Sequence, residues 1–555
     1  MGTADLVLKS NAVFTGDGSQ PFRGGVAIAD GRILTCGDDL HLVPFVGPST
    51  DVRDYGDQLI MPGLIDSHTH FAQGAMTTDP DFCVNLIDCT SFEQCMERVV
   101  AFADVHPDNE WILGVQVIQF QWEIPEMPTA RMIDEYISNR PVFLQQVDMH
   151  TYSANTRAME KAGVTRDTPD PSGGKILRDV DGNPTGVFSN NAAGPFLSLV
   201  YNPPLDRARE SFGKTVRRAN GFGITSVGAV HPTFVSLDNP YEVFADMSRQ
   251  GEFPLRVFVY TDLFDLESKT PEEVRAAYAF PGTTVEWCGF KEFVDGVCSD
   301  HTAWMFEPYA NASETCGEPV EKPERIRVGI LKACELGYPV RIHAIGDHSI
   351  RFVLDCFEEA ETLYGKKGLR HCVEHNETVQ PEDLPRYAEL GISPAMQPWH
   401  MLLDMADLAK DAAVGPERAA LSWPLHSLIA SGANVHLGSD FPVVGIEPME
   451  EIYGAVYRML EDGSNPEGWF PAERITMAEA LKAYTYGSAY AMGLDDRLGT
   501  LAAGKVADIC VLDHNLFACA PAEVLTTRAV LTVLGGRVVF EESRQRHTLQ
   551  GTRRL

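Results

Sequence analysis

Residues 61–70 read Met61-Pro62-Gly63-Leu64-Ile65-Asp66-Ser67-His68-Thr69-His70, an apolar run that ends in two histidines one residue apart. The run predicts a buried strand, because side chains along a strand alternate between its two faces and His68 and His70 then point the same way. Two imidazoles on one face can bind one metal ion, and Asp66 and Ser67 are close enough to orient an imidazole. On spacing alone, two solvated histidines at a strand end are the alternative.

The segment from Pro62 to His70 resembles the first-strand signature of the amidohydrolase superfamily, metal-dependent hydrolases built on a (β/α)₈ barrel. The resemblance continues in order along the chain and is to the branch that is similar to N-substituted formamide deformylase. It is carried by Asp148-Met149-His150 with Asn155, Gly289-Phe290-Lys291-Glu292-Phe293-Val294-Asp295-Gly296, Arg341-Ile342-His343-Ala344-Ile345-Gly346-Asp347, Glu374-His375 and Gly438-Ser439-Asp440. It implies an α/β fold with a TIM-type barrel and metal ligands at several strand ends.

Apolar runs that end in polar residues give candidate strands for this barrel. There are eight, at residues 59–66, 224–230, 256–262, 289–295, 339–343, 369–375, 392–398 and 434–440. The last seven are spaced so that a helix fits between them, as a (β/α)₈ barrel requires. We therefore expect the barrel to occupy residues 59–497. The long gap at 72–218 holds two more strand-like runs, at 111–117 and 141–147, and predicts an inserted subdomain.

Both ends of the chain carry hairpin signals. Near the N-terminus, apolar runs flank Asp30-Gly31, and near the C-terminus they flank Gly535-Gly536. Short apolar runs joined by such dipeptides are typical of β-hairpins. Neither end has enough apolar surface for a core of its own, so we expect residues 1–58 and 498–555 to form one composite β-sandwich. The family resemblance implies the same split domain with the barrel inserted in it.

Composition limits the partners and the compartment. The formal charge of −33, from 45 basic and 78 acidic residues, argues against nucleic acid or an anionic membrane surface as a partner. The twelve cysteines contain no C-x-x-C pair, a pattern typical of reduced thiols. The first residues lack a basic and apolar leader, and no run reaches the ~18 apolar residues of a membrane helix. We expect a cytoplasmic enzyme that forms a homo-oligomer.

The predicted strand ends and the resemblance together give a set of candidate metal ligands: His68, His70, Lys291, His343, His375 and Asp440. Taken singly, each has another interpretation. His343 or His375 would more often be a hydrogen-bonded core histidine, and Asp440 could cap a helix. Lys291 could extend its amine to solvent or pair with Glu292 or Asp295. The resemblance instead implies a carbamylated Lys291 that bridges two ions.

Imidazole and carboxylate or carbamate oxygen suit Zn²⁺, and less selectively other divalent transition metals. We expect one or two zinc ions, with His68, His70 and Asp440 on the first and His343 and His375 on the second. Such an ion lowers the pKa of a bound water and holds it against a substrate carbonyl. Asp440 is expected to act as general base and then general acid.

The expected substrate is a small-molecule amide, linear or cyclic, whose C–N bond is hydrolysed. Candidate substrate-binding residues are His150, Trp122, His301, Trp304 and Trp399, and the tryptophans favour an apolar or aromatic group on the substrate. Two departures from the branch pattern, at Ser189-Asn190-Asn191 and at 297–301, leave the specificity open. The alternatives are a metal-dependent decarboxylase on the same barrel and a non-catalytic binding protein.

Overall fold

An eight-stranded parallel sheet with helices around it forms the centre of the computed structural model, which describes residues 2–119, 122–147, 149, 151–171, 173–231, 239–406 and 409–542. Its strands lie in chain order. They are β6 (Leu64–Thr69), β13 (Ile224–Val230), β14 (Arg256–Asp262), β15 (Val285–Phe293), β16 (Val340–Ala344), β17 (Cys372–His375), β18 (Ser393–Met396) and β19 (His436–Leu437). All eight predicted positions contain a strand.

Backbone contacts bring the first and last strands together. The amide of His70 donates to the Phe441 carbonyl at 2.7 Å, and the amide of Asp440 donates to the His68 carbonyl at 2.8 Å. Gly438 permits this approach, because a Cβ at that position would lie 2.7 Å from the His68 nitrogen. The sheet is therefore an almost closed barrel of the TIM type, with His68 and Asp440 beside each other where it closes.

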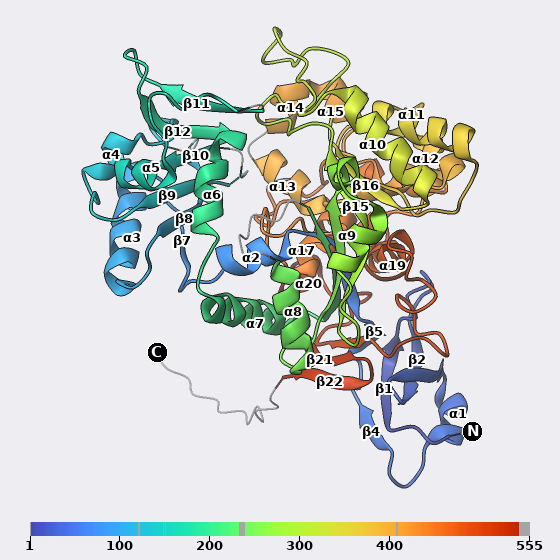
Figure 1. The fold of residues 1–555 in the computed structure, drawn as a ribbon. Helices are drawn as coiled ribbons and strands as arrows, with labels where there is room; N and C mark the ends of the chain where they lie inside the picture. The colour runs from blue at the N-terminus through green and yellow to red at the C-terminus, as the bar shows by residue number, and fades with distance from the viewer. Residues whose placement is uncertain are drawn as a thin grey trace.

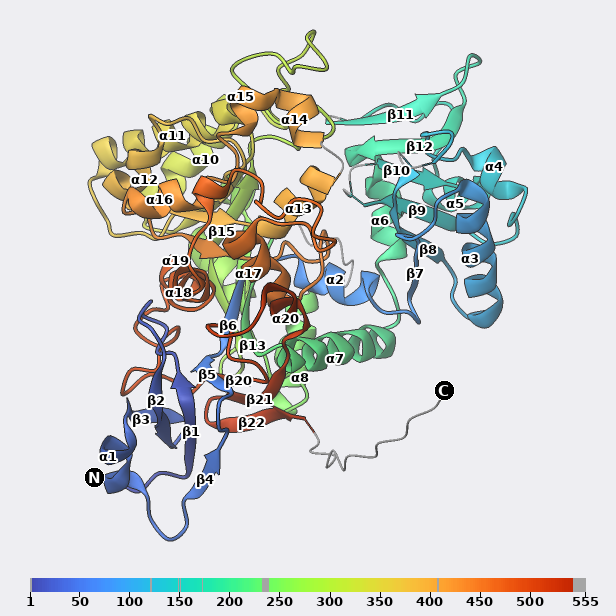
Figure 2. The same cartoon turned by 180° about the vertical axis from the view of Figure 1, so that it is seen from behind.

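Helices connect and cover the barrel strands, as Figures 1 and 2 show from opposite sides. They include α7 (Leu205–Gly221), α8 (Pro240–Arg249), α9 (Pro271–Ala277), α10 (Pro323–Leu336), α11 (Asp347–Tyr364), α12 (Leu384–Leu390), α16 (Leu425–Ala430) and α17 (Pro448–Tyr457). Shorter helices follow β6, β18 and α17: α2 (Phe71–Thr77), α13 (Pro398–Ala406), α14 (Ala409–Val414), α15 (Pro416–Ala419), α18 (Met477–Lys482) and α19 (Ser488–Ala491). One continuous apolar core joins most of these helices to the strands, whereas buried residues of α14, α15 and α19 belong to smaller clusters.

The first predicted strand, 59–66, is wrong in one respect, because two strands of different sheets share that run. Residues Leu59–Pro62 form β5 in the terminal sheet, and β6 of the barrel begins at Leu64. The chain changes sheets at Gly63, whose amide donates to the Asp508 carbonyl. A Cβ on Gly63 would lie 2.4 Å from the Thr225 side chain, so the close crossing requires glycine there.

Strands from both ends of the chain share a second eight-stranded sheet, which lies below the barrel in Figure 1. It contains β1 (Leu6–Val13), β2 (Phe22–Ala29), β3 (Arg32–Gly37), β4 (Asp51–Asp54), β5, β20 (Ile509–Leu512), β21 (Ala529–Leu534) and β22 (Arg537–Glu541). Both predicted hairpins are confirmed, with Ala29 opposite Arg32 and Leu534 opposite Arg537. A buried cluster joins side chains of both termini. Their arrangement as a sandwich stays a prediction.

A third, six-stranded sheet lies beside the barrel and follows α2. Its strands are β7 (Cys83–Asn85), β8 (Ile112–Val117), β9 (Val142–Gln146), β10 (Thr151–Ala154), β11 (Gly174–Arg178) and β12 (Pro184–Asn190), and its helices are α3 (Phe92–Val105), α4 (Ala130–Asp134), α5 (Thr156–Ala162) and α6 (Gly194–Val200). The two strand-like runs predicted in this segment correspond to β8 and β9. The helix α7 begins inside the expected range 72–218 but packs on α2 and β13 as a barrel helix.

No helix in the described part of the chain combines the length and the apolar composition that a bilayer span requires.

Candidate metal centre

His68, in β6, and His70, one residue past its end, face a carboxylate from the other end of the barrel sequence. The Nε2 atoms of His68 and His70 lie 3.4 and 3.3 Å from Asp440 Oδ1. One potential ligand atom from each residue lies within 4.8 Å of the others, and all three side chains are largely buried. The two imidazoles of the H-x-H pattern therefore meet at the same point in space, as predicted, although the strand itself ends at Thr69.

Asp440 is held in a special backbone conformation at this point. It has φ +59°, in the left-handed region that L-residues seldom adopt, directly before the cis bond between Phe441 and Pro442. The next long helix, α17, has Glu447 as its N-cap, so the alternative role of Asp440 as a helix cap is wrong. Burial alone would raise the pKa of Asp440, but His68 and His70 hold it well below its usual range. The carboxylate is therefore ionised, as a metal ligand must be.

Two further histidines lie next to this group. His375, at the end of β17, and His400, in the first turn of α13, share Asp440 in a second set of ligand atoms that lie within 4.8 Å of one another. The ring of His343, at β16, is 4.4 Å from the ring of His375. Nε2 of His343 lies 3.3 Å from the Gly296 carbonyl, so Nδ1 is the ring nitrogen that remains for a ligand. Burial lowers the pKa of both His343 and His375 well below the usual value, so both imidazoles are neutral and each has a nitrogen lone pair for a metal ion.

Lys291 lies on the neighbouring strand β15 and is completely buried. Its Nζ has no hydrogen-bond partner among the described residues and lies 3.4 Å from the centre of the Phe293 ring. The alternative interpretation requires Lys291 to pair with Glu292 or Asp295. Glu292 instead accepts from the Phe293 amide, and Asp295 accepts from the amides of Trp304 and Gly346. Burial lowers the pKa of Lys291 to about 8.

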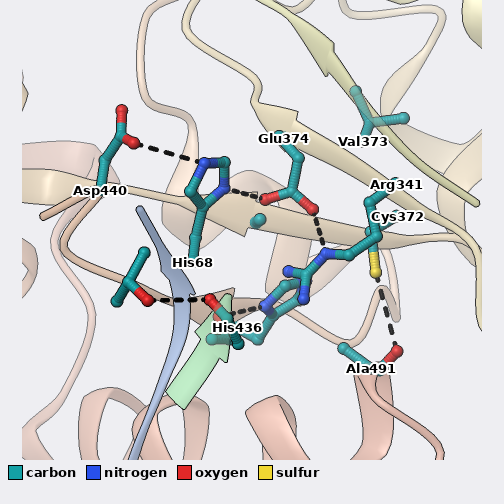
Figure 3. A network of polar contacts seen from close by, with 12 residues as sticks. His68, Arg341, Cys372, Val373, Glu374, His436, Asp440 and Ala491 are labelled. Carbon is teal, nitrogen blue, oxygen red and sulfur yellow. Dashed lines mark hydrogen bonds and ion pairs between the residues drawn. The ribbon is translucent and has the colours of Figure 1, made fainter. Parts of the chain in front are cut away.

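A buried ion pair positions His68 from behind (Figure 3). Nδ1 of His68 lies 2.5 Å from Oε2 of Glu374, and the other carboxylate oxygen accepts from Nε of Arg341 at 2.6 Å. A carboxylate only accepts hydrogen bonds, so Nδ1 of His68 carries the proton and Nε2 faces Asp440 as the potential ligand. Burial would raise the pKa of Glu374, but Arg341 holds it well below its usual range.

Of the two predicted supporting residues, Ser67 contacts an imidazole and Asp66 supports the backbone instead. The Asp66 carboxylate accepts from the amide and hydroxyl of Ser439, at 3.0 and 2.6 Å, and so fixes the backbone next to Asp440. Ser67 contacts an imidazole, but that of His436, at 2.8 Å. The residue that orients His68 is Glu374, 306 positions away in the chain. The sequence contains no separate indication of this role, because Glu374 is notable there only as the neighbour of His375.

The predicted substrate residues fall into different places. Trp122 packs in the core of the inserted sheet and donates to the Cys89 carbonyl, away from the histidine cluster. The Trp304 ring stacks on His348 of α11 at 3.7 Å. His301 contacts Asn311 at 2.8 Å. Trp399 precedes His400 and is the tryptophan next to the cluster along the chain, and His150 lies outside the described residues.

The donor set fits a divalent transition metal. Buried polar atoms without hydrogen-bond partners in the described part of the chain include Lys291 Nζ, His343 Nδ1 and His375 Nδ1. Groups of this kind are costly to bury unless a ligand satisfies them. Imidazole nitrogen and carboxylate oxygen are ligands that zinc and its neighbours accept. His400, which was not among the ligands predicted from the sequence, belongs to this set.

Comparisons with known proteins agree with this geometry. The model of the Amidohydrolase family matches residues 51–540. The Arabidopsis thaliana protein LONG AFTER FAR-RED 3 is 31% identical over 97% of this chain and 92% of its own length. The N-substituted formamide deformylase of Arthrobacter pascens is 25% identical over 97% of this chain and 99% of its own.

A solved structure supports the same assignment. An uncharacterized metal-dependent hydrolase from Pyrococcus furiosus superposes with a TM-score of 0.72 at 26% identity, covering 92% of this chain and 99% of that one. The family match spans the barrel and most of the terminal sheet, including every candidate ligand described above. The chain belongs to the amidohydrolase family.

Proposed function

We propose that this protein is a zinc-dependent hydrolase that cleaves the C–N bond of a small linear or cyclic amide. The observation that supports this best is the convergence of His68, His70 and Asp440 at the carboxyl mouth of a parallel barrel, where (β/α)₈ enzymes place their active sites. The relationship to an enzyme named for the deformylation of N-substituted formamides favours an amide carbonyl as the reacting group.

His68, His70 and Asp440 would hold one ion, and His343 and His375 would hold a second. His400 is a further donor for that second position, because its ring nitrogen lies with those of His375 and Asp440. A bound zinc supplies Lewis-acid chemistry: it lowers the pKa of a water and polarises a carbonyl oxygen. Glu374 fixes the protonated Nδ1 of His68, which keeps Nε2 available as a ligand.

Asp440 would move the proton. Its Oδ1 lies between His68 and His70, and the pKa of its carboxyl is held low, so it is ionised and able to accept a proton from the attacking water. The same oxygen then returns the proton to the leaving amine nitrogen, first as general base and then as general acid.

Lys291 would carry a carbamate that bridges the two ions. The amine adds to carbon dioxide through its nitrogen, forms a C–N bond and releases a proton, which requires the neutral form. Complete burial of Nζ lowers the pKa to about 8, which increases the fraction of the amine in that form near neutral pH. The product is an anionic oxygen donor in place of a cation, and it would satisfy a nitrogen that has no hydrogen-bond partner among the described residues.

The substrate would carry an apolar or aromatic group, and Trp399, which directly precedes His400 in the chain, is the candidate residue to contact it. In the described chain none of the twelve cysteines forms a disulfide, which supports the cytoplasmic location that we propose. A homo-oligomeric state belongs to the same proposal.

Metal analysis combined with a substrate panel tests this function. Purified enzyme should contain one or two zinc equivalents per chain and release amine from N-substituted formamides, linear amides or cyclic amides. Asp440→Asn, which keeps the side-chain size but cannot take up a proton in the same way, should lower turnover by roughly 10²-fold or more. Carbon dioxide release from carboxylate substrates would support a decarboxylase instead. A metal-free protein that binds amides without turnover would indicate a binding protein.

A further inference from the structure

Three loops at the carboxyl side of the barrel meet at a buried cluster of Cys298, Glu377 and Lys410. Cys298 follows β15, Glu377 follows β17, and Lys410 lies on α14, beyond β18. Nζ of Lys410 lies 3.1 Å from Sγ of Cys298 and 2.9 Å from Oε2 of Glu377. The three side chains are 2%, 7% and 1% exposed in the order of their numbers. An amine and a thiol are therefore held in direct contact.

The surroundings of this pair are apolar and packed. Cys298 belongs to a cluster with Tyr309, Ile345 and Ala413, which joins the loop after β15 to α14. On the other side, Nζ of Lys410 lies 4.9 Å from the centre of the buried Trp423 ring. Packing of this density keeps both side chains in place. The contact between nitrogen and sulfur is thus a fixed feature of the fold.

We propose that Lys410 and Cys298 are a covalent modification site, at which a peroxide converts the contact into an N–O–S crosslink. In the first step the thiol is oxidised to a sulfenic acid by hydrogen peroxide, which is reduced to water. In the second step the ammonium form of Lys410, the sulfenic acid and another hydrogen peroxide give the N–O–S bond, two waters and one proton. Each step transfers two electrons from the protein to one peroxide, and the linked product gains one oxygen and loses two hydrogens relative to the free amine and thiol.

The geometry favours this product over progressive oxidation of the sulfur. A sulfenic acid reacts further with peroxide or is captured by a nearby nucleophile. Here the amine nitrogen is 3.1 Å from the sulfur before any reaction, so an oxygen bound to the sulfur forms within reach of the nitrogen, and the oxidative N–O coupling of the second step needs no rearrangement of either backbone. Glu377 holds Lys410 in that position through the contact at 2.9 Å.

The crosslink would join residues 112 positions apart and tie two loops at the mouth of the barrel. Cys298 lies seven positions after Lys291, so the tied loop is continuous with the strand that carries the proposed carbamate. A bond of this span restricts the unfolded chain and should raise the unfolding temperature by a few degrees. An accompanying change in turnover rests on the proposed function, whereas the chemistry of the bond itself does not.

Peptide mapping of the full-length protein tests the proposal. The protein is treated with hydrogen peroxide, remaining thiols are alkylated, and the digest is analysed without reductant. We expect a crosslinked pair of peptides containing positions 298 and 410, with one oxygen more and two hydrogens fewer than their sum, and we expect a thiol reductant to release it. Cys298→Ser and Lys410→Arg should each abolish the pair, and Lys410→Arg keeps the charge beside Glu377.

Cys334→Ser is the matched control, because Cys334 is also buried and its Sγ lies 3.6 Å from a nitrogen of His371 rather than from an amine. This variant should keep the crosslink. Alkylated Cys298 after peroxide, Cys298 found as sulfinic acid with an unmodified Lys410, or a linkage that has lost a water would each overturn the proposal. All of these outcomes are read in the wild-type protein, so they stay informative even where a variant fails to fold or the amide panel shows no activity.

Discussion

Oε2 of Glu374 lies 2.5 Å from Nδ1 of His68, and both side chains are enclosed within the barrel. The second oxygen of Glu374 binds Arg341, whose guanidinium is also completely buried. Glu374→Gln removes the charge that both partners share and leaves Arg341 as a buried cation without compensation. Loss of one partner of a buried pair costs about 3–5 kcal/mol, and loss of a residue that orients a metal ligand weakens metal binding about 10–100-fold.

Denaturant unfolding of the metal-free protein and a zinc titration measure these two effects of Glu374→Gln separately. The control is Glu267→Gln, which removes an exposed ion pair with Arg325 and should cost about 1 kcal/mol or less. If both variants lose the same small amount of stability and bind zinc equally well, the buried pair has no role in holding His68.

His70→Ala should remove activity and bound metal while the fold persists. The main apolar core consists of hydrophobic side chains and includes none of the candidate ligands. We expect zinc content to fall to a fraction of the wild-type value, with turnover reduced by at least about 10²-fold and an unchanged circular dichroism spectrum. His41→Ala, at an exposed histidine of α1 (Asp39–Leu42), is the matched control. A His70→Ala enzyme that keeps its zinc and its rate would contradict the ligand assignment.

The terminal sheet makes a prediction about truncation. β5 has β1 on one side and β20 on the other, so residues of both termini satisfy its backbone. Cutting the chain at about residue 58 or 497 exposes a strand edge and part of the shared core. Either truncated protein should be insoluble or much less stable, as measured by expression and thermal unfolding. A soluble, active fragment of residues 59–497 would show that the barrel does not need the sheet.

The positions of the barrel strands were predictable, because each is an apolar run that ends in polar residues. The crossing at Gly63 was not, because Leu59 to Ile65 is one continuous apolar run and only the packing of Gly63 on Thr225 divides it. His400 escaped prediction for a related reason: it lies in a helix after β18 rather than at a strand end. Glu374 and Arg341 acquire their roles only through contacts between strands, which no local pattern encodes.

Replacing Glu450 on α17 with glutamine should stabilise the protein by an amount that depends on pH. Burial, followed by repulsion from Glu447 and Glu461, raises the pKa of Glu450 to about 7. The folded state therefore disfavours the ionised form of Glu450. The resulting loss of folding stability begins as the pH rises past the pKa of the unfolded state, near 4.5, and is complete above about pH 7. Glu450→Gln should be more stable than wild type by roughly 1 kcal/mol at about pH 8 and by much less at about pH 5.

Urea unfolding at the two pH values measures this difference for Glu450→Gln. Glu335→Gln, at an exposed glutamate of α10, controls for the loss of a surface carboxylate. A stabilisation of Glu450→Gln that is equal at both pH values would mean that the effect does not come from ionisation.

Lys291 separates a binuclear from a mononuclear site. If its amine forms a bridging carbamate, Lys291→Ala should lose the second ion and most of the activity, and a short carboxylate in the buffer should restore part of both. Lys291→Arg should not restore them, because a guanidinium stays charged and does not take up carbon dioxide. Lys291→Met keeps most of the buried volume and shows how much of any loss comes from packing.

The measurement is the zinc stoichiometry of the wild type and the Lys291 variants, with turnover on the same samples. A mononuclear site makes the opposite forecast, in which the removal of Lys291 changes stability more than catalysis. In the structure the Lys291 amine has no hydrogen-bond partner among the described residues. A purely structural lysine at this position would therefore bury a charged ammonium with no acceptor for its hydrogens. One ion per chain in both wild type and Lys291→Ala, with activity largely kept, would exclude the bridge and leave His68, His70 and Asp440 to carry the chemistry.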